Sequence, residues 1–499
     1  MLKIFIALVM IELIFIVCDS KTFNEPYGNS LQKIIVISII TIFIVFLVSK
    51  PISNWKYTEE PYDIYNKYLV DAIINHKTSI DIEPSQALKN LENPYDVNSR
   101  EGVQYYFDTA YYKEKYYVYY GVVPAIILLV PYKLVTGLYL KTEVATMIFV
   151  LLSIIINVRL TIEIYKRWFK NLPFKMLLMF IISNLIAGSY MWMTWRMWVY
   201  ELVTMAGLFF VQLGLLLIIN ATCNKEKIKY TKVFLSCLCM AIAVGCRPNL
   251  VLASIIMLPF LIDILKNVGK SKIGIAIVSI VLPYLIVAVP LMVYNYTRFG
   301  NIFEFGARYQ LTITNVNETV GKITDIPKGL YKYFIETVRG KKEFPYIGLD
   351  TGTKGFTSNY YNGGTVGGIL FLNLTLIGLT LLPVCITETK DKILKTLLWL
   401  LPITGIIIAT VTVIMAGSHH RYIIDFFYLF TIDAMIIWCI IYEKIPAKKT
   451  VFVLIVFLIL ASLFINFCAT YLSSEYDFLK NLAPKTYEYW RELMTFKKR

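Results

Sequence analysis

Carboxylates with the potential for acid–base chemistry are concentrated in the first polar stretch of an otherwise apolar chain. A carboxylate can take the proton of an attacking hydroxyl group, and Glu60, Asp63 and Asp108 are the candidates here. Asp63 is the first choice because it closely follows an apolar segment and shares a predicted helix with Tyr62. Asp108 ranks second and Glu60 third. A structural role, as a helix N-cap or a solvated acid, is the alternative for each of them.

Cationic side chains recur near the ends of apolar segments, where a phosphate on a lipid would lie. This set comprises Arg196, Arg247, His420 and Arg421. Arginine can contact phosphate through two parallel hydrogen bonds, and a charge inside an apolar run is costly and usually functional. Asp425 follows Arg421 at helical i, i+4 spacing, so an ion pair between these two residues is an equally weighted structural alternative.

No metal site is assigned from the sequence. His419 and His420 are adjacent, point in different directions and lack a third ligand. The eight cysteines lie in or beside apolar runs without a C-x-x-C motif, which disfavours a zinc or redox centre. The cofactor, including any need for a divalent metal, stays unknown.

The elements that must position these side chains are membrane helices. Of 499 residues, 57% are hydrophobic and only 17% charged, with a mean hydropathy of +0.61. Soluble domains contain roughly 45–50% apolar and about 25% charged residues. The excess lies in long runs such as 233–246 and 273–293, which are too apolar to be one face of a surface helix. The composition excludes a soluble enzyme, a disordered chain and a disulfide-rich secreted module.

Apolar stretches of suitable length predict the spanning helices. They are 2–18, 31–49, 144–164, 176–194, 202–221, 233–250, 251–265, 273–295, 367–387, 396–416, 422–442 and 450–471. The stretch 121–137 is short and contains Pro124, Pro131 and Lys133, so an interfacial or re-entrant element is favoured. Residues 1–499 are therefore predicted to form a single all-α polytopic membrane domain of about 11–13 transmembrane or re-entrant helices.

The net charge of +15 is placed so that it orients the chain in a membrane. Most of the excess lies in five short connections: 165–175, 222–232, 266–272, 388–395 and 443–449. By the positive-inside rule these connections face the cytoplasm, so the charge indicates topology and no nucleic-acid partner.

Two long polar loops, 51–118 and 298–365, and the tail 472–499 are expected on the opposite, extracytoplasmic side. This arrangement requires 121–137 to return to the side from which it came. If 121–137 crosses the membrane instead, loop 51–118 lies inside, and charge alone slightly favours that alternative.

Several motifs, in chain order, resemble those of bacterial GT-C superfamily membrane glycosyltransferases, close to the family 39 (protein mannosyltransferase-like) group. The resemblance rests on the aromatic run 105–124, on Gly245-Cys246-Arg247-Pro248-Asn249, and on the runs 294–300 and 303–312. The chain departs from the family pattern in two respects. Lys113-Glu114-Lys115 lacks the expected glycine, and no adjacent Asp-Glu pair marks the first loop.

The resemblance implies a GT-C-like fold and inverting transfer of a hexosyl or pentosyl group from a polyprenyl-phosphate donor. The acceptor would be a cell-envelope glycan, lipid or protein at the outer face of a bacterial plasma membrane, among membrane lipids. The carboxylates named above would supply the base, and the cationic set would bind the donor phosphate. Candidates for substrate binding are Tyr62, Tyr112, Glu201, Arg298, Glu304 and Arg308. Most tyrosines of 105–120 are better explained as an aromatic belt at the membrane interface than as sugar-stacking platforms.

A multi-spanning transporter or flippase of envelope-glycan precursors is the alternative function. It predicts internal repeats and polar side chains near the bilayer midplane. Asp263 and Asp433 are the main deep acids, no repeat is visible, and the other polar residues gather toward one side. The transferase is therefore preferred.

Overall fold

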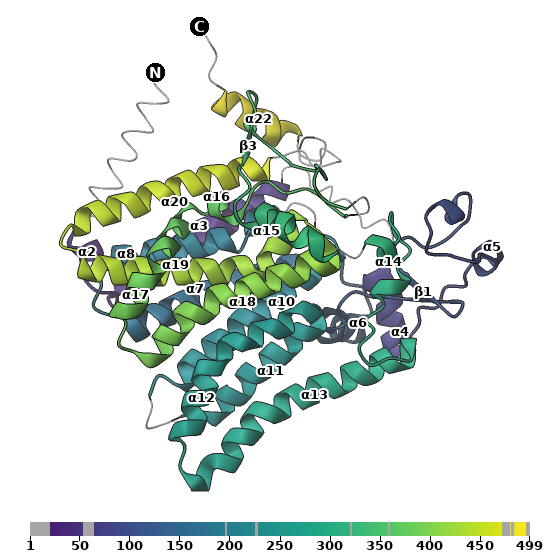
Figure 1. The fold of residues 1–499 in the computed structure, drawn as a ribbon, viewed down its shortest axis with the longest axis horizontal. Coiled ribbons are helices and arrows are strands. Elements are labelled where there is room, and N and C mark those ends of the chain that lie inside the picture. The colour runs from purple at the N-terminus through teal and green to yellow at the C-terminus, as the bar shows by residue number, and fades with distance from the viewer. Residues whose placement is uncertain are drawn as a thin grey trace.

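The computed structural model describes residues 20–52, 64–194, 197–224, 228–319, 322–357, 360–471, 480 and 484–495. Within these residues the protein is a bundle of long helices with two short hairpins as its sheet (Figure 1). The main helices are α3 (Ser30–Ile52), α7 (Thr142–Trp168), α8 (Phe174–Ala187), α10 (Val199–Ala221), α11 (Tyr230–Cys246), α12 (Leu258–Asn267), α13 (Ile273–Phe299), α18 (Lys392–Ala416), α19 (Ile424–Lys444) and α20 (Lys448–Thr470).

Shorter elements connect and cap the bundle. On the N-terminal side these are α2 (Lys21–Asn24), η1 (Ile64–Leu69), α4 (Val70–Ile74), α5 (Gln86–Lys89), η2 (Asn98–Arg100), β1 (Ala110–Tyr112), β2 (Lys115–Tyr117), η3 (Ala125–Leu129), α6 (Val130–Thr136), α9 (Tyr190–Met193) and η4 (Pro248–Met257). On the C-terminal side they are η5 (Lys270–Lys272), η6 (Ala307–Tyr309), α14 (Val316–Thr319), η7 (Ile323–Asp325), α15 (Ile326–Phe334), β3 (Arg339–Gly340), β4 (Ile347–Gly348), α16 (Ile369–Leu372), η8 (Leu374–Leu381), α17 (Leu382–Glu388), η9 (His420–Ile423) and α22 (Pro484–Met494).

Nine helices of the described chain are long and apolar enough to cross a membrane, which supports a polytopic all-α membrane protein. Four of the predicted spans differ from the observed elements. The span predicted for 176–194 is divided between α8 and α9, and the one predicted for 251–265 between η4 and α12. The span predicted for 233–250 ends at Cys246, because Arg247 is extended and Pro248 follows it. Proline sterically disfavours the helical conformation for the residue that precedes it. The span predicted for 367–387 is divided at Asn373 into α16 and η8–α17. The predicted helix 2–18 lies outside the described residues.

The ambiguous stretch 121–137 contains a short helix, Ala125–Thr136. At ~1.5 Å per residue it extends about 18 Å, which is less than the ~30 Å of a bilayer core. Gly121 lies against the end of α11, since a Cβ atom there would be 2.0 Å from the carbonyl oxygen of Cys246. This close approach anchors the residues before the short helix to the end of α11.

The two long polar loops pack together at one end of the bundle, opposite the basic connections. Phe174 donates a backbone hydrogen bond to Glu25 at 2.8 Å, so α3 starts at the basic end. At the other end, the backbone N–H of Asp108 donates to Leu311 at 2.9 Å, and Arg100 donates to the carbonyl oxygen of Thr312 at 2.6 Å. Figure 1 shows α5, β1 and α14 on the right and α2 and α17 on the left.

The strands β1 and β2 form an antiparallel hairpin in the first loop. Tyr111 pairs with Tyr116, and the turn is made by Lys113 and Glu114, both in the left-handed region, with φ of 47° and 56°. Two consecutive residues with positive φ make a type I′ turn, whose twist matches that of a two-residue hairpin. Tyr119 and Tyr120 follow β2 in the chain, so the hairpin determines where these two residues begin.

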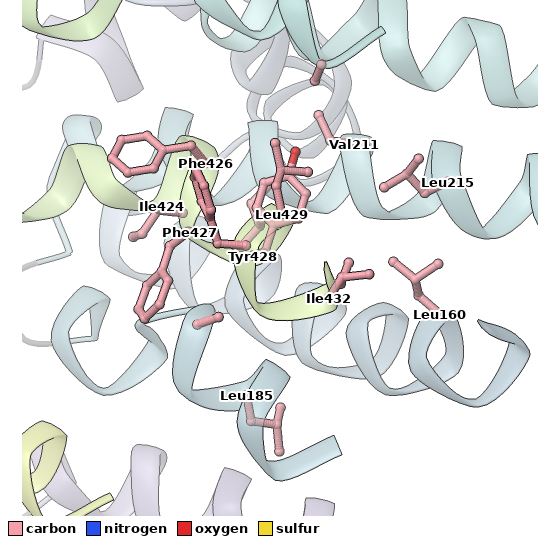
Figure 2. Close-up of a cluster of buried hydrophobic side chains, with 14 of the residues drawn as sticks. Leu160, Leu185, Val211, Leu215, Ile424, Phe426, Phe427, Tyr428, Leu429 and Ile432 are labelled. Carbon is pink, nitrogen blue, oxygen red and sulfur yellow. The ribbon is translucent and has the colours of Figure 1, made fainter. Parts of the chain in front are cut away.

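Helix α19 is the centre of the bundle. Every residue in its most apolar window is buried, as expected for a helix that is hydrophobic on all sides. Figure 2 shows Phe426, Phe427 and Leu429 of α19 among side chains of α7, α8 and α10, such as Leu160 and Val211. Helix α13 is at the opposite extreme, with 17% of its apolar window buried.

A buried ion network holds the second polar loop. Lys332 donates to Asp350 at 2.8 Å and lies 3.4 Å from Glu336, while Arg339 lies 2.5 Å from Asp350. Burial raises the pKa of Glu336, and its hydrogen bond to Asp350 raises the pKa further. Burial alone would raise the pKa of Asp350, but hydrogen bonds from Glu336 and Lys332 hold it well below its usual range. The two carboxyl groups therefore differ in acidity, with the proton more tightly held on Glu336 than on Asp350.

Candidate functional site

Two arginines and two carboxylates from distant segments meet at the end of the bundle that carries the polar loops. Arg247 donates from Nε and Nη2 to Oδ2 of Asp425 at 3.1 and 2.8 Å. Arg421 lies 3.8 Å from Oε1 of Glu201. We call these four residues the arginine–carboxylate cluster. It unites Glu201, Arg247 and Arg421, three of the residues selected from the sequence.

Local structure explains why the four side chains converge. Glu201 and Asp425 both lie in the first turn of a helix, where the helix dipole and free N–H groups favour a carboxylate. Oε2 of Glu201 also accepts from the backbone N–H of Trp198 at 3.2 Å. Arg247 occupies the extended residue between α11 and η4, so its side chain leaves the α11 axis at the point where Asp425 begins α19.

Two polar neighbours complete the surroundings of Arg247 and Asp425. Asn249 donates to Oδ2 of Asp425 at 2.7 Å, and Nη1 of Arg247 donates to Thr204 at 3.1 Å. Oδ2 of Asp425 thus accepts from three donors. The side chains of Asp425 and Arg247 are only 2% and 16% exposed, so this pair is a fixed, largely desolvated ion pair.

Arg421 has a different environment. Its guanidinium carbon lies 4.2 Å from the ring centre of Tyr200 and 5.3 Å from that of Tyr422, which are cation–π distances. Its Nε is buried without a hydrogen-bond partner among the described residues, as is Nδ1 of His420. His420 packs edge-on against Trp192, with ring centres 4.4 Å apart. Arg421 therefore retains hydrogen-bonding capacity that Arg247 has already used.

Asp108 is connected to the arginine–carboxylate cluster by contacts through two tyrosines, Tyr119 and Tyr120. The hydroxyl of Tyr119 donates to Oδ1 of Asp108 at 2.5 Å and lies 3.0 Å from the hydroxyl of Tyr120. Burial raises the pKa of both tyrosines well above the usual value, and the charge of Asp108 raises it further, so both stay protonated. The ring of Tyr120 meets that of Tyr200 at 5.3 Å, which connects Asp108 to the surroundings of Arg421.

The backbone at Asp108 is itself unusual. Its φ is +63°, a left-handed conformation that non-glycine residues adopt uncommonly and that recurs at functional sites. Its backbone N–H is fixed by Leu311 of the second loop. A cavity of about 20 Å³, lined by Tyr119, Tyr120 and Pro248 among others, has room for about one water molecule. A substrate would therefore have to displace side chains in order to enter this cavity.

The other predicted substrate-binding residues lie away from the cluster. Arg298 is buried and donates to the carbonyl oxygen of Val118 at 2.6 Å, so it supports the chain that leads to Tyr119. Glu304 accepts from the backbone of Gly306 at 2.7 Å, and Arg308, which is 76% exposed, lies 3.9 Å from Glu304. Tyr112 packs on Tyr309 at 4.5 Å in a separate aromatic group.

Four selected residues lie outside the described part of the chain: Glu60, Tyr62, Asp63 and Arg196. The structure pairs Asp425 with Arg247, and Arg421 with Glu201, instead of pairing Arg421 with Asp425. The reason is local, because residues 420–423 form a 3₁₀ turn. Its three residues per turn rotate Arg421 away from the face that an α-helical i, i+4 pair would share.

Several contributors were not selected from the sequence, namely Tyr119, Tyr120, Tyr200, Thr204 and Asn249. Asn249 directly follows Arg247-Pro248, which interrupts an apolar run. That position in the sequence could have marked Asn249 as a candidate site residue. Tyr119 and Tyr120 belong to the tyrosine-rich stretch that was interpreted mostly as an interfacial belt. The hydrogen bond from Tyr119 to Asp108 and the 3.0 Å contact between the two hydroxyls distinguish them from belt residues.

The part of the chain that the structure describes has no group of three or more histidine, cysteine, aspartate or glutamate side chains placed to hold a metal ion. No family model, curated protein or solved structure matches the chain. The geometry of the site and the motif resemblance are therefore the grounds for a functional proposal.

Proposed function

We propose that the protein is an inverting glycosyltransferase that moves a sugar from a polyprenyl-phosphate donor to a cell-envelope acceptor at the outer face of a bacterial plasma membrane. One observation carries the proposal: a carboxylate that accepts a hydrogen bond from the half-buried phenol of Tyr119 is linked through Tyr120 and Tyr200 to the buried Arg421, where two polar loops meet the ends of membrane helices. This combination supplies a proton acceptor and cations at the depth where a lipid phosphate would sit.

Asp108 is the base in this mechanism, with Asp63 and Glu60 retained as alternatives. The carboxylate takes the proton of the acceptor hydroxyl while that oxygen bonds to the anomeric carbon. The bond from the anomeric carbon to the phosphate oxygen breaks, and polyprenyl phosphate leaves with the electron pair. The hydrogen bond from Tyr119 keeps the Asp108 carboxylate oriented.

The two arginines have different roles in the proposal. The Arg247–Asp425 contact is short, at 2.8 Å, and is reinforced by Asn249. The Arg421–Glu201 contact is looser, at 3.8 Å, and the Nε of Arg421 has no hydrogen-bond partner among the residues described. The leaving phosphate therefore binds Arg421, with charge-assisted hydrogen bonds, while Arg247 holds α11 and α19 in place.

The test is label transfer by the purified full-length protein. Labelled polyprenyl-phosphate sugars should lose label to an envelope fraction, and Arg421→Lys should raise the donor KM although the charge is kept, because lysine lacks the bidentate geometry. Transfer from a nucleotide sugar in the absence of polyprenyl lipid would refute the proposal.

A transporter or flippase is the second candidate, favoured by one observation. Asp433 is fully buried in α19, and neither of its carboxylate oxygens has a hydrogen-bond partner among the described residues. Intramembrane acids of this kind often mark transport pathways. Vesicle-reconstituted protein that moves labelled lipid-linked sugar across the bilayer, with loss of movement in Asp433→Asn and no transfer chemistry, would favour this candidate.

A further inference from the structure

A groove of about 380 Å³ lies in the first loop, separate from the arginine–carboxylate cluster. Its volume falls in the range of about 300–1,000 Å³ that is typical of small-molecule sites. Four tyrosines line it, among them Tyr105, Tyr106 and Tyr116, together with the polar residues Asp81, Glu83 and Gln104. None of the residues lining it is a lysine or arginine.

Three of the four rings are held by contacts with one another or with a residue outside the groove. Arg100, which does not line the groove, stacks on Tyr105 with its guanidinium carbon 4.6 Å from the ring centre. Tyr116 is buried, meets Tyr106 edge-on at 5.7 Å, and its hydroxyl accepts from the backbone N–H of Tyr106 at 3.3 Å. These contacts hold the rings that border the groove, so little side-chain freedom would be lost when a ligand binds.

The two carboxylates of the groove are acceptors whose charge is already balanced. Asp81 accepts from Lys77 at 2.9 Å, and Glu83 is paired with Lys89. Both carboxylates remain 83% exposed, so each has oxygen lone pairs open to a ligand. Balanced carboxylates do not select a strongly cationic ligand, and the absence of lining cations disfavours a phosphate or an acidic polymer.

Fixed aromatic faces, carboxylate oxygens and an amide match a neutral glycan, whose C–H faces pack on rings and whose hydroxyls donate to carboxylates. We propose that this groove binds a neutral oligosaccharide and, resting on the proposed function, that this oligosaccharide is the acceptor.

The position of the groove supports the link to catalysis. Tyr106 precedes Asp108 by two residues, and Tyr116 of β2 precedes Tyr119 by three. A fully extended chain spans at most ~3.3–3.6 Å per residue, so these offsets correspond to at most about 7–11 Å. A short saccharide in the groove can thus extend toward the Asp108 carboxylate.

The experiment measures binding without a donor, so that it stands apart from catalysis. Saturation-transfer NMR on the full-length protein would use chitotetraose and mannotetraose as probes. At least one probe should bind, and Tyr105→Leu, which keeps apolar bulk over Arg100, should weaken binding about five- to tenfold. Tyr331→Leu is the matched control, because Lys328 stacks on Tyr331 at 4.8 Å outside the groove.

Binding of neither probe to the wild-type protein, or equal binding by the wild type and Tyr105→Leu, would overturn the glycan site. If sugar binding depends on Tyr105 but the protein transfers no label, the glycan site is supported and the proposed function is refuted. If the protein transfers label and the acceptor KM is unchanged in Tyr105→Leu, the proposed function is supported and the groove is not the acceptor site.

Discussion

At the scale of single residues, the site depends on how each buried charge is neutralised. Asp425 accepts from Arg247 twice and from Asn249 once, so this carboxylate has little capacity left for a substrate. Asp108 accepts a hydrogen bond from the phenol of Tyr119, whose raised pKa keeps that phenol protonated. In the proposed mechanism the base is Asp108 and not Asp425.

Replacing Asp108 by asparagine should lower sugar transfer about 10²–10⁴-fold, the usual cost of losing a general base. Tyr119→Phe should cause a smaller loss, because the carboxylate remains but loses a hydrogen bond. Steady-state label transfer measures both, with the exposed Glu101→Gln as a control in the same loop. Near-normal turnover in Asp108→Asn would move the base to Asp63 or Glu60.

Removal of one partner of the Arg247–Asp425 pair should destabilise the protein by about 3–5 kcal/mol, since the other charge is left buried and unpaired. A double variant, Arg247→Met with Asp425→Leu, should cost less than the sum of the single changes. Thermal unfolding in detergent tests this non-additivity. Additive losses would mean that the two side chains do not act as a pair.

The residue types of the site could be predicted from sequence, but their partners could not. Arg247, Arg421 and Glu201 stand out because charges near the ends of apolar runs are rare and costly. Pairing Arg247 with Asp425 joins positions 178 residues apart and depends on the end of α11 reaching the start of α19. The hydropathy pattern does not indicate which helix ends contact each other.

At the scale of elements, short breaks in the helices direct the functional side chains. The Arg247-Pro248 step and the 3₁₀ turn at 420–423 each turn an arginine toward a carboxylate on another helix. Spans were predictable because lipid demands long apolar helices. The division of the predicted span 367–387 at Asn373 was not predictable from the sequence. It is stabilised by tertiary hydrogen bonds from the Asn373 side chain to Ser183 and Thr431.

The loop network of Lys332, Glu336 and Asp350 should make the second loop most stable at mildly acid pH. The pKa of Glu336 is raised, so its contribution is present at low pH and is lost as pH rises through that raised value. The pKa of Asp350 is lowered, so its contribution is present above the ordinary value of about 3.9 and is lost only as pH falls through the depressed value.

Limited proteolysis across a pH series should therefore show cleavage of the second loop increasing as pH rises through the raised pKa of Glu336. Glu336→Gln keeps a neutral hydrogen-bond donor and should flatten this rise in cleavage. An unchanged rise in that variant would show that another group controls the loop.

At the scale of the whole molecule, the polar chemistry is gathered at one end and the basic connections at the other. In a cysteine-free background, Ser99→Cys in the first loop should react with an impermeant thiol reagent in intact cells. Ser271→Cys in a basic connection, equally a solvent-exposed serine, should react only after lysis. The reverse pattern would place the candidate site in the cytoplasm and exclude an extracytoplasmic sugar transfer.

The enclosed position of α19 also has a consequence for biosynthesis. Arg247 leaves the ribosome 178 residues before Asp425. At about 5–20 residues per second, the arginine waits on the order of 10–40 s for its counter-charge. During that interval a nascent chain carries an uncompensated cation at the end of a membrane hairpin, which makes α19 the segment that completes assembly. Nonsense truncations upstream of α19 should accordingly be cleared by membrane quality-control proteases, however many spans they retain.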